Sequence, residues 1–237
     1  MSAAQPDIRG NVFPIYLAAD QSQSMTPWIQ NLNKGLEYLL NEMHKYPLEA
    51  AKIRFAIIGF ADDAHVELAM CDLRDIREVP KLSPRGKSTR YSAAFDMLRE
   101  RIPQDIELMS SQGYGVLRPT VFFLTDGEPM EIPADVWMSS LSRLTDNDWR
   151  PHPNILSFGI DKGAREENAG NIRKVATRPD YAFVAADPSK TGEALTEFLK
   201  ALMHTVVESA RNLNEGGTDL LVEPPAGFVK VSADLIT

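Results

Sequence analysis

The pattern that most constrains the fold is an alternation of short, apolar, β-prone runs with longer segments of helical periodicity. Residues 12–19, 53–60 and 120–125 are apolar almost throughout, as strands buried on both faces of a parallel sheet are. Between residues 28 and 43 the apolar side chains instead recur every three or four positions, which indicates one face of a helix. This repeated order predicts an α/β fold with a mostly parallel sheet and helices on both of its faces.

The rest of the chain continues the same order. Residues 64–71 are expected to form a hairpin with residues 53–60, which places one antiparallel strand at an edge of the sheet. We predict residues 1–10 to be a lead, 11–212 to be the domain, and 213–237, with its GG, PP and AG pairs, to be an extended tail. The further expected elements are helices at residues 88–102, 135–144, 166–176 and 189–212 and strands at residues 155–160 and 181–185.

Composition narrows the functional classes. The chain has 237 residues, 43% of them hydrophobic, which is enough for one sizeable core. Its net charge of −8 disfavours a nucleic-acid backbone or an anionic membrane surface as the partner. The single cysteine, Cys71, excludes an intrachain disulfide and a Cys-rich zinc site. Because the N-terminus has no signal-peptide pattern and no apolar run is long enough to span a membrane, we expect a soluble cytoplasmic protein.

Oxygen-bearing side chains stand at two expected strand ends and at one expected helix start. Asp20, Ser22 and Ser24 follow the first strand, Asp126 follows the strand TVFFLT, and residues 86–89 (Gly-Lys-Ser-Thr) lead into a helix. Each motif alone is also typical of a turn or a helix cap. Since the carboxyl ends of parallel strands meet at one edge of a sheet, we expect these oxygens to converge. Hard oxygen donors without imidazole or thiolate favour Mg²⁺, with Mn²⁺ and Ca²⁺ as alternatives.

Together these motifs resemble the metal-ion-dependent adhesion site (MIDAS) of von Willebrand factor A (VWA) domains. That site combines Asp-x-Ser-x-Ser, a distant Thr before a helix, and Thr-Asp-Gly after a central strand. The resemblance extends over about residues 10 to 210 and implies a three-layer α/β/α Rossmann-like fold. The segments PIYLAADQSQSM, FFLTDGEP and EPPAGFVKV are most similar to the TerY-type bacterial members, which are associated with tellurite-resistance and stress-response gene clusters.

The resemblance implies a role for four of the motif residues. Ser22 and Ser24 would be direct hydroxyl ligands of the ion, and Asp20 would bind it directly or through water. Asp126 would act through a water molecule. The ion would therefore keep an open position for an anionic group from outside the domain.

The fifth residue, Thr89, comes from aligning TRYSAAF with the family pattern Thr-x-x-Gly-Ala-Ala-Leu. It would be the ligand that engages or releases the ion, and the neighbouring Ser88 is the alternative hydroxyl. The chain departs from the family at two positions, because Gln23 and Ser92 replace small glycines.

The function implied by the resemblance is a non-enzymatic module that binds the Asp or Glu of a partner protein through Mg²⁺. The TerY-type likeness implies a scaffold that acts with a kinase, a phosphatase or another stress-response protein. One alternative is a metal-dependent phosphatase, which would need a second Asp where Ser22 stands. Another is a co-subunit of an AAA-type ATPase. Met130 and Ile132, just beyond Asp126, are candidates for an apolar rim beside the site.

Overall fold

The computed structural model describes residues 9–133, 135–214 and 225–231. Its helices are α1 (Ile29–Met43), α2 (Pro47–Ala50), α3 (Tyr91–Ser111), α4 (Val136–Leu144), α5 (Glu166–Val175) and α6 (Thr191–Asn214). Its strands are β1 (Asn11–Asp20), β2 (Ile53–Phe60), β3 (Ala64–Asp72), β4 (Gly115–Val116), β5 (Thr120–Thr125), β6 (Asn154–Gly159), β7 (Ala182–Ala185) and β8 (Phe228–Lys230). Within these ranges no helix is both long and apolar enough to cross a membrane.

The strands form one sheet in the order β3-β2-β1-β5-β6-β7-β8, and β4 pairs with the start of β1. Strand β1 is parallel to β2 and to β5, and the parallel pairing continues through β6 to β7. At one edge β3 is antiparallel to β2, which confirms the predicted hairpin. At the other edge β8, from the segment predicted as a tail, pairs antiparallel with β7.

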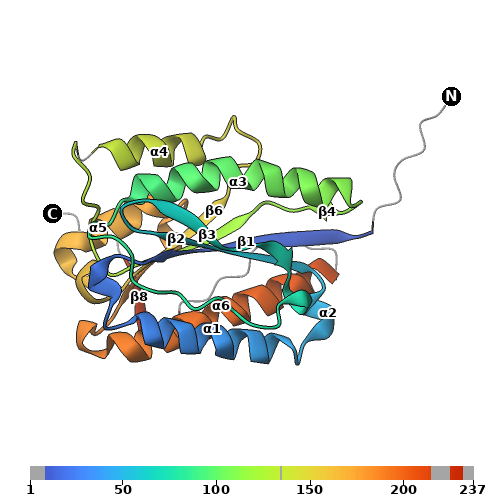
Figure 1. Cartoon of the computed structure of the whole chain (residues 1–237), viewed down its shortest axis with the longest axis horizontal. Helices are drawn as coiled ribbons and strands as arrows, with labels where there is room; N and C mark the ends of the chain where they lie inside the picture. The colour runs from blue at the N-terminus through green and yellow to red at the C-terminus, as the bar shows by residue number, and fades with distance from the viewer. Residues whose placement is uncertain (1–8, 134, 215–224, 232–237) are drawn as a thin grey trace.

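Helices cover both faces of this sheet, with α1 and α6 on one side and α3 and α4 on the other (Figure 1). The alternation of side chains along β1 explains the two layers. Ile15 and Leu17 pack in the core that α1 and α6 share, whereas Tyr16 and Ala18 pack in the core formed with α3 and α4. Because both faces of β1 are buried, its sequence is apolar on both, as predicted. The predicted three-layer α/β/α fold is confirmed.

Helix α3 is the main departure from the predicted boundaries. The helix expected at residues 88–102 begins at Tyr91 and continues through Pro103 to Ser111. Pro103 lies inside this helix, although a proline removes one helical hydrogen bond. Beyond it, Asp105 and Met109 are buried, and the Tyr16 hydroxyl donates to Asp105 Oδ2 at 2.8 Å. These tertiary contacts keep the second half of α3 helical.

Candidate metal site

The two carboxylates predicted for the site lie together at the carboxyl ends of two central strands. Asp20 is the last residue of β1, and Asp126 directly follows the last residue of β5. Because β1 and β5 are adjacent and parallel, their carboxyl ends bring both side chains to one place. Both residues are 0% exposed, so two acidic groups are buried next to the hydroxyls described below.

A chain of hydrogen bonds joins the first loop to the second. The backbone N–H of Ser22 donates to Asp20 Oδ1 at 2.8 Å. The hydroxyls of Ser22 and Ser24 are 2.9 Å apart, and Ser24 Oγ donates to Asp126 Oδ1 at 2.8 Å. The structure thus brings together four of the five residues predicted from the sequence.

Thr125, at the end of β5, holds the second oxygen of Asp20. Its hydroxyl donates to Asp20 Oδ2 at 2.6 Å, in a pair where both residues are fully buried. Burial raises the pKa of Asp20, while hydrogen bonds from Ser22 and Thr125 act in the opposite direction. A bound cation would favour the charged form of this carboxylate. Sequence reasoning missed Thr125 as a supporting residue, although it stands in the Thr-Asp-Gly motif.

The structure distinguishes the two hydroxyls that lead into α3. Ser88 is turned toward the β2–β3 hairpin, where its backbone N–H and its hydroxyl both donate to Asp62 Oδ1. Thr89 is buried, and its Oγ1 lies 3.7 Å from the position that a Cβ on Gly127 would take. The geometry therefore places Thr89, and not Ser88, beside the loop that carries Asp126. Asp62 lies in the turn between β2 and β3.

Two further contacts fix Thr89 against that loop. The backbone N–H of Met130 donates to the carbonyl of Thr89 at 2.9 Å. The hydroxyl of Tyr91, at the start of α3, donates to the carbonyl of Gly127 at 2.8 Å. The start of α3 and the loop after β5 are consequently held together by hydrogen bonds from both sides.

The donor set fits a hard divalent cation. All five predicted side chains offer oxygen, namely two buried carboxylates and three hydroxyls. In the described part of the chain, no three His, Cys, Asp or Glu side chains gather where they could hold a metal ion. A site rich in hydroxyls with few carboxylates suits an ion that keeps water or takes an external anion.

Comparisons with known proteins agree with this architecture. No family model matches the chain. Mouse integrin alpha-11 is 23% identical over 172 residues, which cover 70% of this chain and 14% of the integrin. A solved von Willebrand factor type A protein from Catenulispora acidiphila superposes with a TM-score of 0.53 at 15% identity, covering 82% of this chain and 43% of that one. The fold is that of a von Willebrand factor A domain.

A second solved VWA neighbour bears on the metal. Proximal thread matrix protein 1 from the mussel byssus, solved with a zinc-occupied MIDAS motif, superposes with a TM-score of 0.54 at 17% identity. The superposition covers 81% of this chain and 46% of that one. This chain thus spans less than half of either solved neighbour and a small part of the integrin. At these identities the likeness shows the shared fold.

The two residues that depart from the VWA pattern, Gln23 and Ser92, differ in burial. Gln23 is exposed in the short 3-10 helix Gln23–Met25, and its carbonyl accepts a hydrogen bond from the Thr26 hydroxyl at 2.6 Å. Ser92 is buried in the first turn of α3, where its backbone N–H donates to Glu131 Oε1 at 2.6 Å. Glu131, a buried carboxylate that sequence reasoning missed, therefore supports the start of the helix after Thr89.

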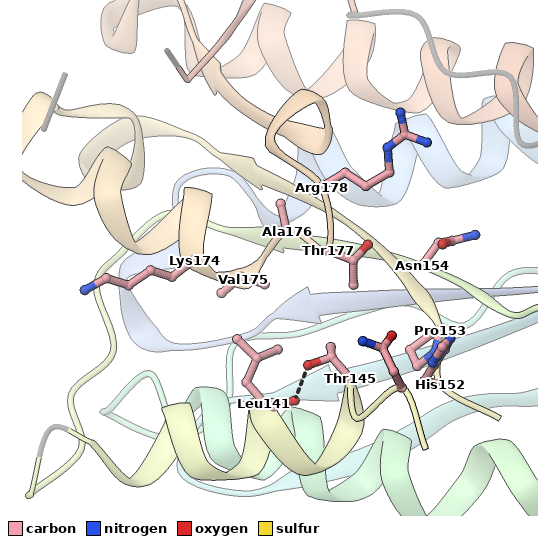
Figure 2. Close-up of a pocket in the computed structure, with 11 residues that line it drawn as sticks. Leu141, Thr145, His152, Pro153, Asn154, Lys174, Val175, Ala176, Thr177 and Arg178 are labelled. Carbon is pink, nitrogen blue, oxygen red and sulfur yellow. Dashed lines mark hydrogen bonds between the residues drawn. The ribbon is translucent and has the colours of Figure 1, made fainter. Parts of the chain in front are cut away.

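A separate pocket of about 330 Å³ lies at the other end of the strands from the candidate metal site (Figure 2). Its walls come from the end of α4, the start of β6 and the segment after α5. Asn154 begins β6, so the pocket is at the amino ends of the strands and the candidate metal site is at their carboxyl ends. Figure 2 shows Lys174 and Arg178 pointing away from each other, and they form no joint anion site.

Proposed function

We propose that this VWA domain is a non-enzymatic, divalent-cation-dependent protein-binding module. The observation that carries the proposal is the hydrogen-bonded chain Ser22–Ser24–Asp126, which unites oxygens that lie 102 positions apart in the sequence. Ser22, Ser24 and Thr89 would hold the ion through their hydroxyls, Asp20 would bind it directly or through water, and Asp126 would act through a water molecule. The zinc-occupied MIDAS of the mussel protein supports a divalent ion in this fold. We propose Mg²⁺, because short oxygen donors on rigid strand ends suit a small octahedral ion.

Charge balance at the site supports an acidic partner. Where the carboxylates act through water, the groups in direct contact with the ion are neutral hydroxyls and water molecules, so the ion retains affinity for a further anion. Arg85, Lys87 and Arg90 are exposed in the segment around Thr89. These cations would attract an Asp or Glu side chain of the partner and increase its rate of association.

The surface beside Thr89 supports a second feature of the partner. Met130 is 60% exposed and Ile132 is 97% exposed, although most large apolar side chains of the described chain are buried. The hydrogen bond from Met130 N–H to the Thr89 carbonyl fixes this apolar rim next to the site. We therefore propose that a large apolar side chain flanks the acidic residue of the partner.

Calorimetric titration with MgCl₂ tests the metal site. Ser22→Ala is the sharpest variant, because it removes the hydroxyl while the backbone N–H that holds Asp20 remains. Wild type should bind one Mg²⁺ and Ser22→Ala should not. Ser139→Ala, an exposed serine on α4, is the matched control and should bind as wild type does. Equal binding by Ser22→Ala and wild type would place any ion elsewhere.

Selection from a random peptide library tests the partner chemistry. Peptides captured in Mg²⁺ and released by EDTA should share an Asp or Glu, and changing it to Asn or Gln should abolish capture. Peptides with an apolar neighbour should bind more weakly to a Met130→Ser/Ile132→Ser double variant. Capture that persists in EDTA would contradict the proposal.

The finer proposal is a cytoplasmic scaffold in a tellurite or stress response. It rests on the TerY-type likeness of PIYLAADQSQSM, FFLTDGEP and EPPAGFVKV. Co-precipitation from a native extract, with and without EDTA, tests it. A kinase or phosphatase recovered only with Mg²⁺ present is the expected result, and recovery of an AAA-type ATPase would favour that alternative.

The phosphatase alternative requires an acid–base carboxylate two positions after Asp20. Ser22 occupies that position, and its hydroxyl lies 2.9 Å from that of Ser24. We expect no Mg²⁺-dependent hydrolysis of p-nitrophenyl phosphate. Turnover that disappears in Asp20→Asn would instead establish an enzyme.

A further inference from the structure

Gln21 lies between two predicted metal ligands and is completely buried, although loop residues are usually exposed. Its side-chain Nε2 donates to Glu67 Oε1 on the edge strand β3 at 2.8 Å. Its Oε1 is buried with no hydrogen-bond partner among the described residues. Burying a polar group with one atom unsatisfied costs stability, so an apolar residue would serve better as simple core filling.

Glu67 is the centre of a small polar cluster. His65 Nε2 lies 2.8 Å from the same Oε1 atom, and the guanidinium of Arg85 lies 3.7 Å from it. Burial acts to raise the pKa of Glu67, but hydrogen bonds from Gln21 and His65 outweigh it and lower that pKa. The cluster therefore holds a charged carboxylate against the Gln21 amide.

Arg85 provides a second connection, through the backbone. Arg85 lies four positions before Thr89, and its backbone N–H donates to the carbonyl of Gln21. The Asp20–Ser24 loop and the segment that leads to Thr89, both of which would hold the ion, are consequently connected at Gln21. One tie is the main-chain bond from Arg85, and the other is the side-chain path through Glu67.

The strand behind this cluster leaves room for the amide. A Cβ on Gly59 of β2 would lie 2.0 Å from Gln21 Oε1 and 2.9 Å from His65 Nε2. Any residue other than glycine at this position would displace the Gln21 side chain. Gly59 thus offers a way to disturb the cluster without changing any of its polar groups.

We propose that Gln21 and Glu67 are positioning residues that hold the Asp20–Ser24 loop and the Thr89 segment in the spacing that the cation requires. This inference rests on the proposed metal site. Groups that orient metal ligands from outside the coordination sphere typically change metal affinity by about 10- to 100-fold when they are removed. Gln21 and Glu67 act through the loops, so the lower end of that range applies.

Gly59→Ala tests the inference, with Gly115→Ala as the matched control. Both glycines lie in strands, and at both an added Cβ would meet a side-chain amide oxygen. For Gly59 this is the Oε1 of Gln21 at 2.0 Å, and for Gly115 it is the Oδ1 of Asn11 at 2.2 Å. Only Gly59 adjoins the cluster. Calorimetric titration with MgCl₂ should show binding about 10-fold weaker in Gly59→Ala, and within twofold of wild type in Gly115→Ala.

Gln21→Met provides a readout that a purely structural role would not give. It fills the same space and removes both the unsatisfied oxygen and the donor to Glu67, which His65 and Arg85 still contact. Because these two changes affect stability in opposite directions, the midpoint of thermal unfolding without Mg²⁺ should change little while Mg²⁺ affinity falls. This variant decides the question if Gly59→Ala does not fold. If wild type binds Mg²⁺ and Ser22→Ala does not, yet Gln21→Met binds within twofold of wild type, the positioning role is wrong and the metal site stands. If wild type itself does not bind Mg²⁺, both fall.

Discussion

Replacing Thr125 by Val removes the short hydrogen bond to Asp20 from the centre of the site, together with the longer one in which the Gly127 N–H donates to the same hydroxyl at 3.2 Å. Valine has nearly the shape of threonine, so the packing of β5 is kept while the hydroxyl is lost. That hydroxyl donates to Asp20 Oδ2 at 2.6 Å, which is the length of a charge-assisted O–H···O⁻ bond. Both partners are fully buried, so water cannot replace the donor.

The magnitude follows from this geometry. A hydrogen bond to a charged group contributes about 1.5–3 kcal/mol to stability, and Asp20 loses that contribution when the Thr125 hydroxyl is removed. For a chain of this length each kcal/mol lowers the midpoint of thermal unfolding by about 2–4 °C, so Thr125→Val should lower it by about 3–12 °C. Because the loss of this donor also leaves Asp20 less well oriented, Mg²⁺ affinity should fall by about 10-fold or more.

Thr120 on the same strand provides the control. It is equally buried, but its hydroxyl has no hydrogen-bond partner among the described residues. Thr120→Val should therefore leave Mg²⁺ affinity unchanged and raise stability, by about 1 kcal/mol, because it removes an unsatisfied polar group. Thermal unfolding and calorimetric titration of both variants decide the matter. Equal midpoints and equal affinities for the two variants would refute the assigned role of the Thr125–Asp20 bond.

Three other predictions concern the metal and the two cores. Adding Mg²⁺ at a hundredfold excess over its dissociation constant should stabilise wild type by about 2.7 kcal/mol relative to EDTA, and Ser22→Ala should show no such gain in thermal unfolding. Burial raises the pKa of Asp105 above its value in the unfolded chain, so its contribution to stability is greatest at low pH and declines as pH rises through the folded-state pKa. Urea unfolding should accordingly show wild type losing stability relative to Asp105→Asn as the pH rises above about 4, the pKa of an Asp in the unfolded chain, and a constant difference would contradict this. Gly35→Ala should cost about 1–3 kcal/mol in urea unfolding, because the added Cβ would lie 2.0 Å from Leu199 Cδ1 where α1 meets α6. In Gly170→Ala, in α5, the added Cβ would have nothing within 4 Å, so this variant should instead stabilise the protein by about 0.5–1 kcal/mol. Equal changes in the free energy of unfolding for the two variants would count against the close α1–α6 contact.

The layers of this fold were predictable because they depend on periodicity. A strand buried on both faces, such as β5, must be apolar throughout, and a helix that covers it must be apolar every three or four positions. Features that depend on contacts between distant segments were not predictable. The three residues of β8 carry too little pattern to be recognised as a strand, and α3 passes Pro103 because Tyr16, 89 positions from Asp105, holds its second half.

The candidate site divides in the same way. Motif reasoning could name Asp20, because a carboxylate at the end of a buried strand is visible in the sequence itself. It favoured Thr89 and kept Ser88 as the alternative, because the distinction depends on Asp62, a residue of the β2–β3 hairpin that accepts a hydrogen bond from the Ser88 hydroxyl. Gln21 was similarly hidden, since its partner Glu67 lies 46 positions away on another strand. The motif therefore identifies the oxygen donors, while residues outside it, such as Asp62 and Glu67, determine which donors can face the cation together. A motif search would wrongly score substitutions at these outside residues as neutral.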